Sequence, residues 1–281
     1  MSRTLARQWI ESGAVTVNGA AILRASARVA EGARIVIAPP SSTAFRARPS
    51  AEPLPIDIVC DDAAFLVVNK PAGIAVHPSY KQASGTLLHG VLWHVRDRAG
   101  VQPGIVTRLD KDTTGLVLVA LDAATHRLFA RDALEGRLGK RYLAIVSGWP
   151  RPRQGSLSAP IARDPADRRR MIVASDGAPS LTRYAVVSHG ETGGRREALV
   201  ACELATGRTH QIRVHLAAAG WPIVGDRTYG TPDSRIARQA LHASRLSLRH
   251  PRTREVLELE APLPRDMEGL VSAFKPDVHP R

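Results

Sequence analysis

The sequence predicts an α+β fold with a largely antiparallel sheet. Strand-like and helix-like segments do not alternate regularly along the chain, as they would in a doubly wound α/β protein. The C-terminal segments LHASRLSLRHP and EVLELEAPLP also read as successive strands that alternate polar and apolar residues. With 281 residues, 44% of them hydrophobic, the chain is long enough for one sizeable domain and a small appendage.

The first 37 residues form the predicted appendage, a small α/β module. A helix is expected over residues 2–12 and is ended by Gly13. Short strands around residues 15–17 and 35–37 lie on either side of the turn Asn18-Gly19. Arginine outnumbers glutamate here, so the module is either a docking surface for phosphates or a solvated basic face without a partner.

A linker, residues 38–55, follows this module and contains five prolines, which favour extended conformations. Residues 56–281 then form the main domain. Its expected strands cover residues 56–60, 65–69, 116–121, 138–148, 182–187 and 199–204, with two more after residue 240. An irregular, arginine-rich excursion is expected before the strand at 182–187.

Three helices are expected in the main domain. The first covers residues 85–95. The second covers residues 123–135, with Leu128, Phe129 and Leu134 on its buried face and Gly136 at its end. The third covers residues 210–219, capped by Thr209 and ended by Gly220.

The charge of the chain points to a polyanionic partner. Lys and Arg number 39 against 26 Asp and Glu, a formal net charge of +13, and nucleic acid is the commonest polyanion. No apolar run approaches the roughly 20 residues of a membrane-spanning helix, and the N-terminus lacks the apolar segment of a signal peptide. We therefore expect a cytoplasmic protein that binds nucleic acid and no membrane. We also expect it to be a monomer.

Cofactor and metal signals are missing from the sequence. Cys60 and Cys202 lie far apart and form no CxxC pair, and the ten histidines show no ligand spacing such as HExxH. There is also no GxxxxGK[ST] and no GxGxxG segment. We expect no disulfide, no metal and no cofactor.

Asp110 is the first candidate functional residue. It lies between Arg108 and Lys111, just before a Thr-Thr-Gly turn and the apolar run 116–121. Flanking cations favour the charged carboxylate, which could act as a nucleophile or as an electrostatic anchor. The alternative is a structural turn residue whose side chain caps the following backbone, a common role for aspartate.

Three other segments place polar residues next to core segments: NKPAGIAVHP (69–78), KRYLAIVSG (140–148) and TGRTHQIRVHLAAAG (206–220). The last is the most specific, because an otherwise small and apolar helix opens with Arg208, His210, Gln211, Arg213 and His215. The apolar residues between them indicate a packed helix, so Arg213 should need a buried anion, for which Asp110 is the natural candidate.

These segments resemble the RluA-type pseudouridine synthases, which isomerise uridines in ribosomal and transfer RNA. The resemblance covers residues 56 to about 265 in order and implies the pseudouridine synthase fold. SRTLARQWIESGAVTVNG, followed by RIVIAP, resembles the latter part of a small RNA-binding domain shared with a ribosomal small-subunit protein. Its usual first helix is missing, so either the chain is shortened or its start is assigned too far downstream.

The resemblance implies the site. Asp110 of Arg108-Leu109-Asp110 would be the nucleophile, with Tyr142 of the KxYxA strand and Arg213 of GRxHQxRxH as its partners. Thr107 stands where the family usually has histidine, which should affect loop packing or RNA contacts rather than activity. The sequence leaves open whether the carboxylate attacks the anomeric carbon or assists elimination to a glycal.

The other predicted roles concern RNA. The target base must leave its stack, and Tyr142 offers a flat face for it or a hydroxyl for proton transfer, unless it is only a core tyrosine. Arg108 would fill the emptied stack or grip a phosphate. The remaining expected RNA contacts are Lys70, Arg208, His210 and Gln211.

The leading hypothesis is a cofactor-independent pseudouridine synthase acting on large-subunit ribosomal RNA, with DKDTTG closest to a branch that modifies a stem-loop of that RNA. One alternative is a catalytically inactive RNA-binding factor in ribosome assembly. Others are a synthase acting on transfer RNA and a glycoside-type hydrolase, which would need two paired carboxylates.

Overall fold

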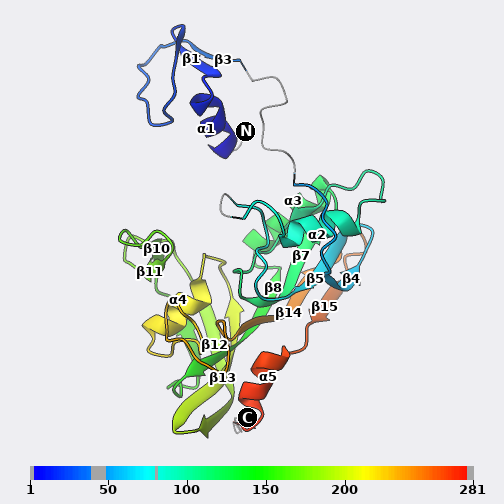
Figure 1. The fold of residues 1–281 in the computed structure, drawn as a ribbon, viewed down its shortest axis with the longest axis vertical. Helices are drawn as coiled ribbons and strands as arrows, with labels where there is room; N and C mark the ends of the chain where they lie inside the picture. Colours follow the sequence, from blue (N-terminus) through cyan, green and yellow to red (C-terminus); the bar gives the residue numbers. More distant parts are fainter. Residues whose placement is uncertain (1–2, 39–48, 80–81, 277–281) are drawn as a thin grey trace. The chain divides into compact units, whose positions relative to one another are not determined.

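The computed structural model describes residues 3–38, 49–79 and 82–276. The chain divides into two compact units, Met1–Arg48 and Pro49–Arg281 (Figure 1). Residues 49–55 of the predicted linker group with the second unit, where Glu52 makes two hydrogen bonds. Its backbone N–H donates to His89 O at 3.2 Å, and its carboxylate accepts from Gly85 N at 2.7 Å.

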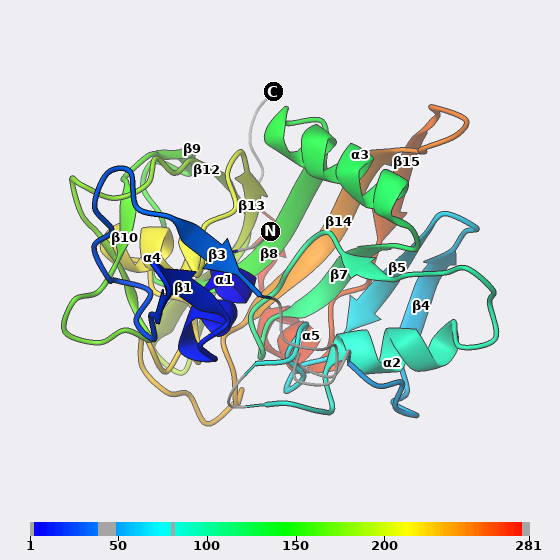
Figure 2. The same cartoon turned by 90° about the horizontal axis from the view of Figure 1, so that it is seen from above.

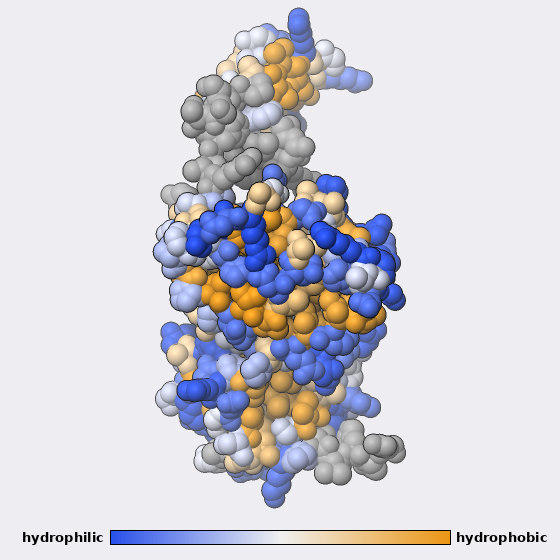
Figure 3. Space-filling model, turned by 90° about the vertical axis from the view of Figure 1, so that its right-hand side faces the viewer, coloured by the Kyte–Doolittle hydropathy of each residue, from blue (hydrophilic) through white to orange (hydrophobic). Residues whose placement is uncertain are grey.

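The first unit contains helix α1 (Arg3–Glu11) and strands β1 (Val15–Val17), β2 (Ala20–Ala21) and β3 (Ile35–Ile37), with sheet order β2-β1-β3. The predicted helix, turn and strands are present. Asn18 and Gly19 both have positive φ and join β1 to β2, as a tight hairpin requires. Val15 is buried, but β3 is exposed, and Figure 3 shows apolar residues at the surface of this unit. Its own core is therefore small.

The second unit is built on one mixed sheet, so the predicted α+β class is confirmed. In the described residues the sheet has eleven strands in the order β16-β12-β13-β8-β14-β7-β5-β4, with β15, β6 and β9 on β14, β7 and β12. Its pairs are antiparallel except β14 with β7. The strands are β4 (Asp57–Asp61), β5 (Phe65–Lys70), β6 (Gly104–Ile105), β7 (Thr114–Ala120), β8 (Gly139–Ser147), β9 (Gln154–Leu157), β12 (Thr182–Thr192), β13 (Arg195–Leu204), β14 (Leu241–Arg249), β15 (Val256–Glu260) and β16 (Lys275–Pro276).

Helices cover both faces of this sheet, and Figure 2 shows α3 (Ala123–Leu134) and α2 (Leu87–His94) on opposite sides of β7. Leu116 and Leu118 pack in the cluster of α3, whereas Val117 and Val119 pack in that of α2. Burial on both faces explains why this strand is apolar throughout rather than alternating. Helices α4 (Gln211–Ala218) and α5 (Arg265–Val271) pack in a third cluster with β8 and β13. No helix in the described ranges has the length and apolarity to cross a membrane.

Several local predictions were wrong. Leu134 is 90% exposed, whereas Phe129 is fully buried and Ala133 packs in the same core cluster. Leu134 follows Phe129 by five residues, which turns it roughly 140° around the helix and away from the buried face. Thr209 does not cap α4; the N-cap is His210, whose φ is 55° and whose side chain makes no capping hydrogen bond. The irregular excursion contains the hairpin of β10 (Ile161–Arg163) and β11 (Met171–Val173).

Substitution of Gly115 is expected to have a large effect on stability. Its φ is 109°, and a Cβ at this position would lie 2.2 Å from the backbone oxygen of Ala243, where β7 and β14 pair in parallel. We expect Gly115→Ala to destabilise the protein by at least about 3 kcal/mol, because backbone atoms on both sides must move. The thermal unfolding midpoint measures this.

Gly136→Ala is the matched control. Gly136 also has positive φ, at 71°, but a Cβ there would meet nothing within 4 Å. Its substitution tests the backbone conformation without the close approach, and should cost about 1 kcal/mol. Equal losses in both variants would contradict the steric explanation.

Candidate active site

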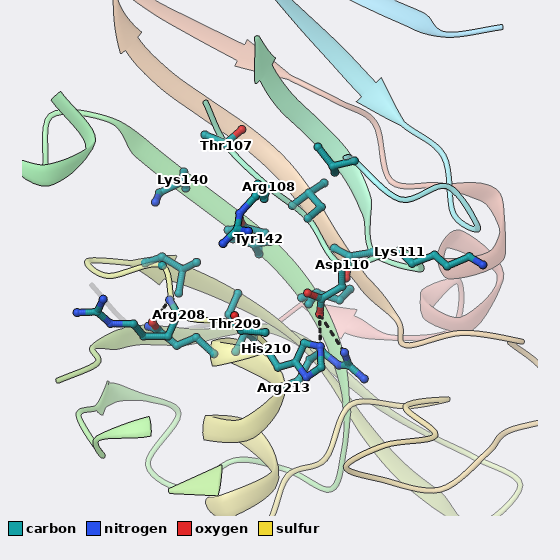
Figure 4. A pocket seen from close by; sticks show the side chains of 18 of the residues that line it. Thr107, Arg108, Asp110, Lys111, Lys140, Tyr142, Arg208, Thr209, His210 and Arg213 are labelled. Carbon is teal, nitrogen blue, oxygen red and sulfur yellow. Dashed lines mark hydrogen bonds and ion pairs between the residues drawn. The ribbon is translucent and has the colours of Figure 1, made fainter. Parts of the chain in front are cut away.

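A pocket of about 520 Å³ brings together three of the polar segments singled out in the sequence. Arg108 and Asp110 come from the loop between β6 and β7, Tyr142 from β8, and His210 and Arg213 from the start of α4 (Figure 4). The volume lies in the range of small-ligand sites.

Asp110 uses its side chain for an ion pair rather than for a turn. Its backbone oxygen accepts the N–H of Thr113 at 3.1 Å, which closes the turn through the main chain. Its Oδ2 accepts from Nη1 of Arg213 at 2.9 Å, and 26% of the side chain is exposed to the pocket. The contacts therefore do not support the interpretation of Asp110 as a structural cap.

Arg213 is held by a second carboxylate that the sequence interpretation missed. Nε and Nη2 of Arg213 donate to the two oxygens of Asp226, at 2.7 and 2.8 Å. Asp226 is fully buried and also accepts the backbone N–H groups of Thr228 and Tyr229. This bidentate pair fixes the plane of the guanidinium and leaves Nη1 to orient Asp110.

The two carboxylates set the charge state of Arg213. Burial opposes its charge, but the hydrogen bonds and charge of Asp226, followed by those of Asp110, raise the pKa of Arg213. Burial likewise opposes the charge of Asp226, yet Arg213 and two backbone N–H groups outweigh it and lower the pKa of Asp226. Asp226 follows the apolar run Ile223-Val224-Gly225, and its position after a buried segment was the available signal.

Lys70 was wrongly predicted to contact phosphate. The residue is fully buried, and its Nζ donates to the backbone oxygens of Pro71, Ile74 and Lys111 at 2.7 to 2.9 Å. Burial lowers the pKa of Lys70 to about 7, and the negative charges of Asp112 and Asp110 oppose this shift. The three carbonyl oxygens take the place of the water that would otherwise solvate the ammonium group. Lys70 thus ties the end of β5 to the loop that carries Asp110.

Lys70→Met should therefore impair catalysis while leaving the RNA-binding surface unchanged. Three buried carbonyl oxygens would be deprived of their donor, which costs about 1–3 kcal/mol each where water cannot replace it. We expect a lower unfolding midpoint and a lower turnover number, with unchanged RNA affinity, measured by thermal unfolding, kinetics and filter binding. A selective decrease in RNA affinity would instead restore the original prediction.

Gln211 also proves to be internal, which corrects the expectation of an RNA contact. The side chain is buried; its Oε1 accepts from Thr206 Oγ1 and Arg208 N, and its Nε2 donates to Leu181 O and Thr182 Oγ1. These bonds shape the loop before α4. Arg208 and Arg108 are exposed and line the pocket, so they remain candidates for RNA contacts.

Tyr142 lies both in the core and at the pocket. Only 7% of the residue is exposed, and it belongs to the cluster of β8, β13 and α4 while lining the cavity. Burial, and then the charge of Asp110, raises the pKa of Tyr142. Its hydroxyl is accordingly held protonated, and any part it takes in proton transfer starts from the neutral phenol.

Thr107 stands where the resemblance leads one to expect histidine. Its side chain forms a hydrogen bond with the backbone. Its Oγ1 accepts the N–H of Leu118 in β7 at 2.8 Å, just after β6, where the Asp110 loop begins. The side chain is nearly buried and borders the pocket. At this position threonine serves the packing of the loop.

Comparison with known proteins agrees with this arrangement. A family model described as RNA pseudouridylate synthase matches residues 64–218, more than half of the chain. The chain belongs to the RNA pseudouridine synthase family. The predicted family and its isomerase class are confirmed, and an S4 domain model matches residues 2–35, in agreement with the predicted RNA-binding module.

Relatives of this synthase match along almost the whole chain. An uncharacterized RNA pseudouridine synthase of Bacillus subtilis is 41% identical over 280 residues, covering 98% of this chain and 90% of the relative. A ribosomal large subunit pseudouridine synthase D of Nitrosomonas europaea is 38% identical, covering 98% and 80%. The solved structure of human RNA pseudouridylate synthase domain containing 1 superposes with a TM-score of 0.65 at 31% identity, over 82% of this chain and 92% of that one.

Proposed function

We propose that this pseudouridine synthase modifies large-subunit ribosomal RNA, with Asp110 as the nucleophile. The observation that carries the proposal is the carboxylate of Asp110 in the pocket, oriented by Arg213 at 2.9 Å, which in turn is anchored by buried Asp226. The substrate class follows from the relatives named ribosomal large subunit pseudouridine synthase D. The formal charge of +13 suits such a polyanion.

The chemistry needs no outside reagent. In the first route, a bond forms from the Asp110 carboxylate to the anomeric carbon as the bond from that carbon to uracil N1 breaks. The uracil turns, its C5 attacks the same carbon, and the carboxylate leaves. The C5 proton then passes to solvent, and a proton returns to N1. In the second route Asp110 assists elimination to a glycal, with the same net isomerisation.

Other side chains around the pocket would hold the flipped base and its neighbouring phosphates. The base must be flipped out, and the part of Tyr142 that lines the pocket offers it a stacking surface worth roughly 1–3 kcal/mol per base. Arg108 and Arg208 at the rim would hold flanking phosphates.

Among the described residues that line this pocket, Asp110 is the single carboxylate, whereas a glycoside-type hydrolase requires a pair. Asp226, the other acid that pairs with Arg213, is fully buried, and both of its oxygens accept hydrogen bonds from Arg213. A general acid or nucleophile must reach the substrate. This arrangement favours a synthase with a single reacting carboxylate.

Release of tritium from RNA labelled at uracil C5 tests the activity. Large-subunit ribosomal RNA transcripts are expected to release label, and transfer RNA transcripts are expected to release none. Release from transfer RNA alone would show that the substrate is transfer RNA and not ribosomal RNA. Release from neither RNA, with RNA binding retained, would favour a catalytically inactive assembly factor. Mapping pseudouridines in ribosomal RNA of a deletion strain would then identify the target.

Removal of residues 1–37 should chiefly weaken RNA binding. The S4-like unit carries more arginine than glutamate and has a small core of its own. Each phosphate that a protein neutralises contributes roughly 0.7–0.9 to the slope of log affinity against log salt. The truncated protein should therefore show a shallower slope with little change in turnover at saturation. An unchanged slope would contradict the docking role.

A further inference from the structure

His210 has an unusual backbone for a residue with a side chain. Its φ of 55° and ψ of 18° lie in the left-handed region, at the N-cap of α4, and its side chain makes no capping bond. Such conformations cost energy in non-glycine residues and persist where surrounding contacts hold them, often at functional sites. Here the ring lies between Tyr229 on one side and Asp110 on the other.

The contacts of Tyr229 determine which ring nitrogen carries the hydrogen. The Tyr229 hydroxyl oxygen accepts the backbone N–H of Met171 at 2.8 Å. Within the described residues, the acceptor in reach of the hydroxyl hydrogen is Nδ1 of His210, also at 2.8 Å. Nδ1 is thus an acceptor, and the neutral ring carries its hydrogen on Nε2.

The charge state of the ring agrees with this tautomer. Burial lowers the pKa of His210; the charge of Asp110 opposes the shift, and the nearby charges of Arg213 and Arg163 reinforce it, with Asp226 opposing. The ring is therefore neutral at pH 7, and its Nε2–H bond faces the carboxylate rather than acting as a second cation beside Arg213.

Both donors converge on one oxygen of Asp110. Nη1 of Arg213 lies 2.9 Å from Oδ2, and Nε2 of His210 lies 3.8 Å from the same atom, as the dashed lines in Figure 4 mark. In the described part of the chain, Oδ1 accepts no hydrogen bond. The carboxylate is thus divided into a held oxygen and an open one.

We propose that His210 is a positioning residue, kept by Tyr229 as the Nε2–H tautomer, whose N–H closes on Oδ2 of Asp110 when uridine enters and leaves Oδ1 as the reacting oxygen. This inference rests on the proposed role of Asp110. Catalytic hydrogen bonds are commonly long before substrate binds and shorten in the complex, to about 2.9 Å for N–H to O. The role differs from the direct RNA contact expected from the sequence.

Two substitutions of His210 separate the ring nitrogens. The amide nitrogen of asparagine takes the place of Nδ1, whereas that of glutamine reaches the place of Nε2. Asparagine also tolerates the left-handed backbone, so His210→Asn removes the donor with little strain. We expect its single-turnover rate of tritium release to fall by about 10- to 100-fold, since small misplacements of a reacting group have effects of this size. RNA affinity should stay within about twofold, because the proposed role of the ring is to position Asp110 and not to bind RNA.

His210→Gln should react at least about tenfold faster than His210→Asn, because it returns a donor to the Nε2 position. Equal rates for the two variants, with equal unfolding midpoints, would overturn the proposal. A rate of His210→Asn within about twofold of wild type would do the same. A change in RNA affinity alone would indicate that His210 contacts RNA directly, as the sequence led us to expect.

Tyr229→Phe provides a second measurement that does not depend on the backbone at residue 210. It removes the hydroxyl that sets the tautomer, and we expect a roughly tenfold slower rate. Because Tyr229 acts through His210, the double variant with His210→Asn should be no slower than His210→Asn alone. If the two rate decreases multiply, Tyr229 acts independently of His210, through Met171 or through Arg213, whose guanidinium carbon lies 5.1 Å from the centre of the Tyr229 ring. That result would overturn the proposed role of Tyr229.

Failure of this inference is distinguishable from failure of the proposed function. If wild type releases no tritium from any RNA, the proposed activity fails. If wild type is active and removal of the Asp110 carboxylate abolishes release, while the His210 and Tyr229 variants behave as wild type, the nucleophile stands and only the positioning role is overturned.

Discussion

Asp110→Asn is expected to reduce tritium release by at least ~10⁴-fold, as removal of a nucleophile does in other enzymes. The asparagine side chain keeps the shape of the aspartate, and Arg213 retains its bidentate pair with Asp226, so the pocket should remain intact. The neutral amide can neither attack the anomeric carbon nor assist elimination. Single-turnover kinetics on labelled ribosomal RNA transcripts measure the decrease.

A neighbouring carboxylate in the same loop is the matched control. Asp112 lies two residues beyond Asp110 and does not line the pocket, so Asp112→Asn should keep most of the activity. Both variants should match wild type in RNA affinity. Equal release from wild type and Asp110→Asn would remove Asp110 from the chemistry.

Asp226→Ala is expected to cost about 3–5 kcal/mol of unfolding free energy, the usual effect of breaking a buried ion pair by removing one partner. The change deprives Nε and Nη2 of Arg213 of their acceptors and leaves two backbone N–H groups without a carboxylate. Turnover should fall as well, because a guanidinium released from Asp226 no longer orients Asp110. Denaturant unfolding of the full chain measures the free energy.

The effect of Asp226 also has a predicted pH dependence. Its pKa is lowered in the folded protein, so its contribution is fully present above the ordinary aspartate pKa of about 4 and is lost as the pH falls through the folded value. The stability difference between wild type and Asp226→Ala should therefore narrow in acid. Asp167→Ala is the control, since its carboxylate pairs with Arg169 on an exposed hairpin and its removal should leave stability nearly unchanged. A difference that persists unchanged below pH 4 would argue against the charged pair.

The fold class and most elements of the second unit could be read from local patterns. Apolar segments bounded by turn residues predicted β4, β5 and β8, and a continuous apolar run predicted buried β7, because these patterns reflect which side chains a strand turns inward. Helix α5 was missed, since it follows Pro264 with a short, weakly patterned segment. The cap of α4 was misassigned because a left-handed N-cap has no simple sequence signature.

The burial of individual polar residues could not be predicted from the local sequence. Lys70, Gln211 and Arg208 look alike in sequence, as polar residues beside apolar ones, yet the first two are buried and the third is exposed. Their partners lie up to 41 residues away, such as Lys111 O for Lys70. Burial of a polar side chain is decided by whether such distant acceptors arrive within hydrogen-bond distance.

By itself the sequence determined the α+β class, the S4-like module, the family and Asp110 as the candidate carboxylate, because these follow from residue chemistry, period and motifs within short segments. The tertiary structure alone decided that Asp226 anchors Arg213, that Lys70 holds the Asp110 loop and that the Tyr229 hydroxyl meets Nδ1 of His210. The physical reason is range. Ion pairs and hydrogen bonds act over about 3 Å, and only the folded chain brings such groups together.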